Sequence, residues 1–162
     1  MHVCGDLCGV SKSAAWRSIH IVIESICKLR NQMIKFPTAD ELVRTEAQFR
    51  QSKNFPGVLG CIDGSHIAVK VLNSSIRETY RNRKGYFSLN VQMICGPDSY
   101  IYDVVSSWPG AAHDSNIFNR SLIARRLRQG EFGDLHLLGD SAYKLTRYML
   151  TPYKNPDTAE KR

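Results

Sequence analysis

Two short, largely apolar segments that each lead into an aspartate constrain this chain more than any other feature. Residues 58–62 run into Asp63, and residues 135–138 run through Gly139 into Asp140. Apolar runs of about four to eight residues are typical of buried strands. A helical connection before the second strand favours parallel pairing of that strand with a neighbour. If the two strands lie side by side, both aspartates are expected at the sheet edge where the ligands of α/β proteins gather.

The segment between these two strands predicts an antiparallel hairpin followed by a helix. Ser88–Met93 alternates strictly, with apolar residues at odd positions, which is typical of a half-buried strand. A turn rich in Gly, Pro and Asp separates it from a second strand, Tyr100–Trp108. Asp114 or Ser115 is expected to cap a helix that ends near Gln129. This order predicts an α/β fold with a mixed sheet.

The first third of the chain has helical periodicity instead. Ser11 can cap a helix, and Thr38 or Asp40 can cap a shorter one after Pro37. The apolar stripe of the first helix consists of Ala15, Ile19, Val22, Ile26 and Leu29. We therefore predict a helical segment over 1–53 and an α/β domain over 54–162.

Composition narrows the class of protein. A hydrophobic content of 43% can support a packed core and argues against a disordered chain. The five cysteines have no paired spacing, which argues against a disulfide framework, and no apolar run is long enough to span a bilayer. With 22 Lys and Arg against 15 Asp and Glu, the net charge of +7 suits a partner that carries phosphates.

Two aspartates at one sheet edge indicate a metal site. Carboxylates a few ångströms apart repel each other unless a cation lies between them. Carboxylate oxygens suit Mg²⁺ or Mn²⁺, which can activate water against a phosphodiester. A structural alternative stays open, because an aspartate after a strand often forms a turn or caps a helix.

Four segments resemble motifs of the PIF/Harbinger transposases and of the nucleases derived from them. These segments are residues 57–67, 82–92, 108–115 and 138–143. The resemblance implies a DDE superfamily endonuclease domain with an RNase H-like fold. That fold has an antiparallel meander, a parallel strand with a crossover helix, and a helix-turn-helix-like segment before it. It also implies nuclease activity on DNA that depends on Mg²⁺ or Mn²⁺. Asp63 and Asp140 would be catalytic and metal-binding, and Asp114 would be a further metal ligand.

The resemblance also implies a third carboxylate, a glutamate on a later helix. The chain ends at Arg162, and Asp157 and Glu160 lie too close to Asp140 to take that place. We therefore expect a chain clipped at both ends, in which the far side of the strand at 135–138 is exposed. A non-catalytic DNA- or protein-binding remnant of a transposase is the alternative function.

Two basic segments are candidate DNA contacts. Residues 70–84 carry five Lys or Arg against one Glu, a net of 5 − 1 = +4, with Tyr80 interleaved. Basic side chains neutralise phosphates and aromatic rings stack on bases. The predicted contacts are Arg77, Arg81, Arg83 and Lys84 there, together with Lys12 and Arg17 of the helix-turn-helix-like segment. A solvated basic loop and a plain amphipathic helix are the alternatives.

The expected partners and location follow from the resemblance alone. It implies DNA as the substrate and a Myb-like DNA-binding protein as a partner, with no membrane. The expected location is the nucleus, with the cytoplasm also allowed.

Overall fold

The computed structural model describes residues 6–153, and contacts divide the chain into two compact units after Lys35. The first unit contains helix α2 (Lys12–Lys28) and the short helix α3 (Arg30–Met33). Helix α4 (Ala39–Lys53) belongs to the second unit and packs against the first strand of the sheet. The sequence assigned α4 to the helical segment instead. None of the helices in residues 6–153 is long and apolar enough to cross a membrane.

Helix α2 begins where the sequence predicted. The hydroxyl of Ser11 accepts a hydrogen bond from the Ala14 N–H at 3.2 Å, and Gly9 before it has a positive φ of 62°. The helix is interrupted at Leu29, which is both the last cap of α2 and the first cap of α3. Only Ala15 of the predicted apolar stripe is buried, so most of the apolar side chains of α2 are exposed.

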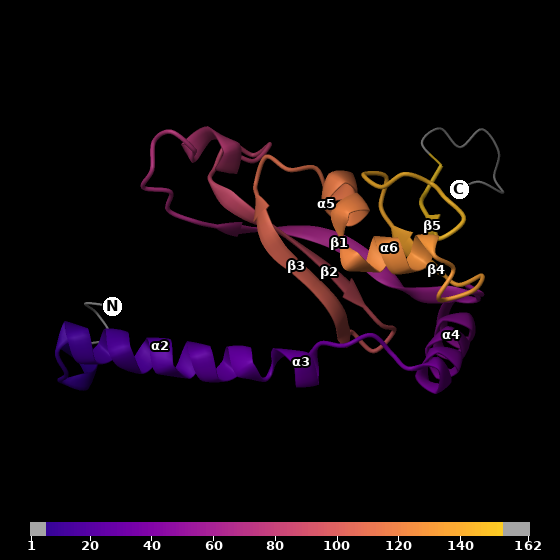
Figure 1. Cartoon of the computed structure of the whole chain (residues 1–162), viewed down its shortest axis with the longest axis horizontal. Coiled ribbons are helices and arrows are strands. Elements are labelled where there is room, and N and C mark those ends of the chain that lie inside the picture. Colours follow the sequence, from indigo (N-terminus) through magenta and orange to yellow (C-terminus); the bar gives the residue numbers. More distant parts are fainter. Residues whose placement is uncertain (1–5, 154–162) are drawn as a thin grey trace. The chain divides into compact units, whose positions relative to one another are not determined.

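A five-stranded mixed sheet forms the second unit, in the order β3-β2-β1-β4-β5 (Figure 1). Strands β1, β2 and β3 form an antiparallel meander, while β4 pairs with β1 in parallel and β5 pairs with β4 in parallel. The strands are β1 (Val58–Ala68), β2 (Ser88–Cys95), β3 (Ile101–Pro109), β4 (His136–Gly139) and β5 (Met149–Leu150). A 3₁₀ helix, η1 (Arg77–Tyr80), lies between β1 and β2. This architecture confirms the predicted mixed sheet of an RNase H-like fold.

The first strand is longer than the sequence predicted. Strand β1 continues to Ala68, because its second half keeps pairing with β2, where Ser65 faces Val91 and Ala68 faces Ser88. Asp63 therefore lies in the middle of a strand, at the level where the neighbouring β4 ends. The prediction that Asp63 ends its strand was wrong, and so was the structural alternative of a turn at this position.

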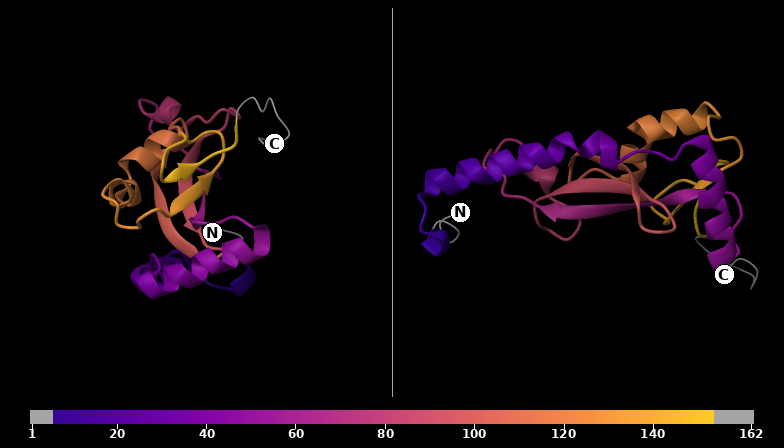
Figure 2. Two further views of the ribbon diagram at one scale, coloured as in Figure 1. Left: turned by 90° about the vertical axis from the view of Figure 1, so that its right-hand side faces the viewer. Right: turned by 90° about the horizontal axis from the view of Figure 1, so that it is seen from below.

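The crossover between β3 and β4 contains two helices where the sequence predicted one. Helices α5 (Asp114–Arg120) and α6 (Leu122–Arg128) are separated by Ser121, whose backbone is extended. The Ser121 hydroxyl accepts from the Ala124 N–H at 3.2 Å and so caps α6. The cap of α5 is His113, without a side-chain hydrogen bond, so neither Asp114 nor Ser115 has the predicted capping role. Figure 2 shows these helices beside the sheet.

The hydrophobic core lies between the sheet and these two helices. Its fully buried members include Leu59, Ile94, Ala124, Leu137 and Met149. Strand β5 covers the outer edge of β4, and the Leu137 N–H donates to the Tyr148 carbonyl at 3.0 Å. Pairing with β5 therefore makes β4 an interior strand, and the expected exposure of its far face is limited, because its residues are half-buried or, at Leu137, fully buried.

We expect His136, at the start of β4, to make the stability of the fold sensitive to acid. Burial lowers its pKa below the ordinary value of 6.5, although a hydrogen bond to the Asp134 backbone opposes this shift, and its buried Nε2 has no partner in the described part of the chain. The imidazole of His136 binds a proton more readily in the unfolded chain than in the folded one. The contribution of His136 to the free energy of unfolding is therefore fully present above pH 6.5 and is lost as the pH falls through the lower pKa of the folded state. Thermal unfolding should show a shallower loss of Tm on acidification for His136→Leu than for the wild type. Equal slopes would contradict this prediction.

Candidate functional site

The register between β1 and β4 brings Asp63 and Asp140 side by side. Ile62 is paired with Gly139 in the parallel ladder, and the next residue of each segment is the aspartate. Both aspartates are exposed. The expectation that the two strands run in parallel, with their aspartates at neighbouring positions, is confirmed.

Backbone donors orient both carboxylates. Oδ1 of Asp63 accepts from the Gly64 N–H at 2.8 Å, and Oδ1 of Asp140 accepts from the Ala142 N–H at 2.9 Å. These contacts engage one oxygen of each carboxylate. The second oxygen of each makes no hydrogen bond with the residues that the structure describes, which leaves it able to bind a cation.

Asp114 is held by a different set of contacts. The Asn90 side-chain amide donates to Oδ1 of Asp114 at 2.7 Å and to the Ala112 carbonyl at 3.0 Å. Gly64 lies directly against this carboxylate, and a Cβ at Gly64 would collide with it. Asp114 covers the face of β1 to which a side chain at position 64 would point. Because successive side chains of a strand point to opposite faces, the side chain of Asp63 points to the other face of β1.

The pKa of the buried Tyr143 phenol is influenced by all three aspartates. The Tyr143 hydroxyl accepts a hydrogen bond from the Gln92 amide at 3.0 Å. Burial raises the pKa of Tyr143, and the negative charges of Asp114, Asp63 and Asp140 raise it further, so the phenol stays protonated. Among residues 6–153, however, the three carboxylates do not form one group that could hold a metal ion.

The sequence missed the polar residues that support this site. Alternation in β2 predicted that the apolar odd positions form the buried face. In the structure, Ser88, Asn90 and Gln92 are among the most buried side chains, and they lie beneath α5 and the loop before it. The available signal was the row of polar residues at every second position of β2, which indicates a shared face that another element can cover.

Two of the predicted DNA contacts have structural roles. Arg81 donates to both carboxylate oxygens of Glu78, at 2.7 and 3.0 Å, and to the Gly85 carbonyl at 3.0 Å. The guanidinium groups of Arg77 and Arg81 also lie 4.4 and 4.8 Å from the centre of the Phe87 ring. These contacts hold η1 against the start of β2.

The other predicted DNA contacts are exposed. Arg83 and Lys84 follow η1, and their side chains make no hydrogen bond or ion pair with the described residues. Lys12 and Arg17 are exposed on α2. A role in binding DNA stays a prediction for these four residues and for Arg77 and Arg81.

The carboxylate pair fits a hard divalent cation in part. Mg²⁺ usually keeps several waters and binds one or two protein carboxylates, which matches the free oxygens of Asp63 and Asp140. Within residues 6–153, however, no group of three or more His, Cys, Asp or Glu residues could hold a metal ion. Asp157 and Glu160 lie outside the described residues.

Comparison with protein families identifies the class of protein. The model of the DDE superfamily endonuclease matches residues 62–162, a segment that includes Asp63, Asp114 and Asp140. The chain belongs to this family, as the four sequence motifs implied.

Several known proteins are similar in sequence to this chain. It is 34% identical over 156 residues to the mouse (Mus musculus) protein named "Putative nuclease HARBI1", and 32% identical over 155 residues to the human (Homo sapiens) protein of that name. It is 23% identical over 173 residues to the Arabidopsis thaliana "Protein ALP1-like". These matches cover 96%, 95% and 98% of this chain but only 44%, 44% and 42% of the relatives. No solved structure matches it.

We expect removal of the Asn90 side-chain amide, which holds Asp114, to lower the stability of the fold. Replacing Asn90 with Leu would leave the Ala112 carbonyl and the Asp114 carboxylate without their donor. We expect the free energy of unfolding in urea to fall by about 1–3 kcal/mol, the cost of unsatisfied buried polar groups. Asn116→Leu, at an exposed position of α5, should change it little. Equal effects of the two substitutions would show that the Asn90 contacts are dispensable.

Proposed function

We propose that this chain carries the catalytic centre of a metal-dependent nuclease that cleaves DNA phosphodiester bonds. Membership of the DDE superfamily endonucleases supports the class of reaction. The single observation that carries the proposal is the parallel register of β1 and β4, which puts Asp63 beside Asp140. Because the chain spans less than half the length of the relatives, the activity of a whole protein of this kind is part of the proposal.

In this proposal Asp63 and Asp140 hold Mg²⁺ or Mn²⁺ through their free carboxylate oxygens. When bound, such an ion supplies positive charge to the scissile phosphate and acidifies water. The Gly64 and Ala142 N–H groups fix the rotation of the two carboxylates, so that both present an oxygen without further rearrangement. Asp114 is a third candidate ligand, and its hydrogen bond from Asn90 limits its movement.

Tyr143 and Gln92 are buried residues that hold the segments carrying the proposed ligands Asp114 and Asp140. Gln92 donates both to the Tyr143 hydroxyl and to the Asp114 carbonyl, each at 3.0 Å, and so ties the loop after β4 to the start of α5. These contacts hold the segments that carry Asp114 and Asp140 in place while substrate binds.

A non-catalytic DNA- or protein-binding domain is the second candidate. The lack of a three-ligand group among residues 6–153 is the observation that favours it. Nicking of supercoiled plasmid by the purified chain separates the two. The nuclease proposal expects nicking in Mg²⁺ or Mn²⁺ and none in EDTA. DNA binding without nicking in either metal would favour the second candidate.

The proposed function extends to the cellular location and the partner of the chain. A DNA substrate supports a nuclear location, which a fluorescent fusion would test; an exclusively cytoplasmic signal would contradict it. Only the resemblance to Harbinger proteins supports a Myb-like DNA-binding protein as partner. Co-purification of such a protein with the tagged chain would support that partnership, and its repeated absence would count against it.

A further inference from the structure

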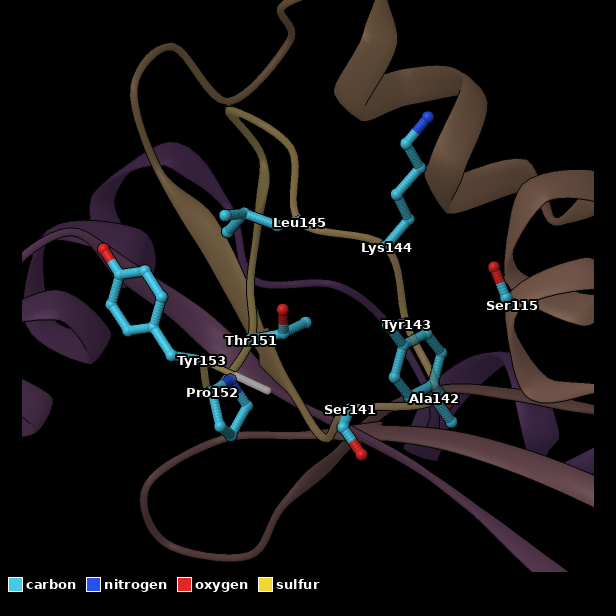
Figure 3. Close-up of a pocket in the computed structure, with 9 residues that line it drawn as sticks. All are labelled: Ser115, Ser141, Ala142, Tyr143, Lys144, Leu145, Thr151, Pro152 and Tyr153. Atoms are coloured by element: carbon cyan, nitrogen blue, oxygen red, sulfur yellow. The ribbon is translucent and has the colours of Figure 1, made fainter. Parts of the chain in front are cut away.

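A hollow of about 390 Å³ opens next to the candidate site (Figure 3). It is formed by the loop that follows Asp140, by the segment after β5, and by Ser115 at the start of α5. Its volume lies within the range of about 300–1,000 Å³ that is usual for ligand pockets. The hollow therefore lies between the segments that carry Asp140 and Asp114.

One side of the hollow is polar and positively charged. Lys144 is exposed and makes no hydrogen bond or ion pair with the described residues, so its ammonium group is available to an anion. Ser115 also lines this part of the hollow, whereas Thr151 lines it nearer to Pro152 and Tyr153 in Figure 3. Figure 3 shows Lys144 and Ser115 on the same side. A phosphate or a sugar matches these groups.

The other side is apolar and aromatic. Leu145, Pro152 and Tyr153 form this wall, and Figure 3 shows Tyr153 across the hollow from Ser115. Leu145 is 52% exposed and Tyr153 is 59% exposed. Every nucleobase has a flat face that stacks on an aromatic ring, whatever the sequence.

We propose that this hollow is a subsite for one unpaired nucleotide of the DNA strand, next to the phosphate bound at Asp63 and Asp140. The backbone of that nucleotide lies towards Lys144 and Ser115, and its base packs against Tyr153 and Leu145. The proposal rests on DNA being the substrate of the proposed nuclease. It adds a requirement for an unpaired base beside the cleavage point.

Binding of single-stranded DNA tests this subsite without any cleavage. The probes are two fluorescent oligodeoxynucleotides of equal length, one with ordinary bases and one with abasic sites, measured by anisotropy in EDTA with the full chain. We expect the ordinary strand to bind at least about fivefold more tightly, because one stacked base contributes about 1–3 kcal/mol. Tyr153→Ala should remove most of this difference and leave abasic binding unchanged. Tyr100→Ala, at an exposed tyrosine in the turn between β2 and β3, should retain it.

Lys144→Gln tests the charged side of the hollow. It should weaken binding of both probes and lower the salt slope by about one. Arg44→Gln, at an exposed position of α4, should change neither. Equal binding of the two probes, or equal effects of Tyr153→Ala and Tyr100→Ala, would overturn the subsite. Plasmid nicking in Mg²⁺ together with equal probe binding would overturn the subsite alone and leave the nuclease proposal standing.

Discussion

Asp63→Asn is expected to lower the rate of plasmid nicking by more than about 100-fold. The loss of residues that only support metal ligands already costs about 10- to 100-fold, and Asp63 is proposed as a ligand itself. The substitution keeps an oxygen that can accept from the Gly64 N–H, so the strand should fold as in the wild type. Nicking is measured as conversion of supercoiled to open-circular plasmid in Mg²⁺ and in Mn²⁺.

Asp134→Asn is the matched control for this experiment. Asp134 is an exposed aspartate before β4, whereas Asp140 follows the other end of that strand. Its substitution should leave nicking unchanged. Equal loss of nicking in Asp63→Asn and Asp134→Asn, or full activity of Asp63→Asn, would place the reaction elsewhere.

Leu137→Ala is expected to lower the free energy of unfolding by about 2–5 kcal/mol, the range for large-to-small substitutions in a core. Leu137 is fully buried at the centre of β4, between β1 and β5. The prediction therefore tests whether Leu137 of β4 is packed in the core. Chemical denaturation by urea gives the measurement.

The control for Leu137 lies in the neighbouring strand. Leu150 of β5 is 37% exposed, and Leu150→Ala should cost no more than about 1 kcal/mol. If both substitutions cost the same small amount, Leu137 would not be part of the packed core.

Local patterns predicted the strands and the pair at the site well. Continuous apolar runs indicated buried strands, and a helical crossover favoured parallel pairing, but the structure was needed to show that β1 and β4 are neighbours. The motif resemblance led to the same pair, and the family comparison supports the class of protein. Local patterns were insufficient where pairing with a distant partner decides the structure. Strand β1 continues past Asp63 because β2 supplies hydrogen bonds, and no residue near Asp63 indicates this.

The supporting residues of the site were harder to predict for the same reason. Asn90 and Gln92 look like the solvent face of a half-buried strand until α5 covers them. The two-residue strand β5 is too short for any periodicity. In each case tertiary contacts decide the role of a residue whose local pattern points elsewhere.

Binding of Mn²⁺, followed by electron paramagnetic resonance, tests the shared role of Asp63 and Asp140 most directly. The wild type and Asp134→Asn should bind Mn²⁺, with loss of the free-ion signal on titration. The double variant Asp63→Asn/Asp140→Asn should leave the free-ion signal unchanged at the same protein concentrations. Mn²⁺ binding by the double variant as tight as that of the wild type would contradict a metal centre formed by these two aspartates.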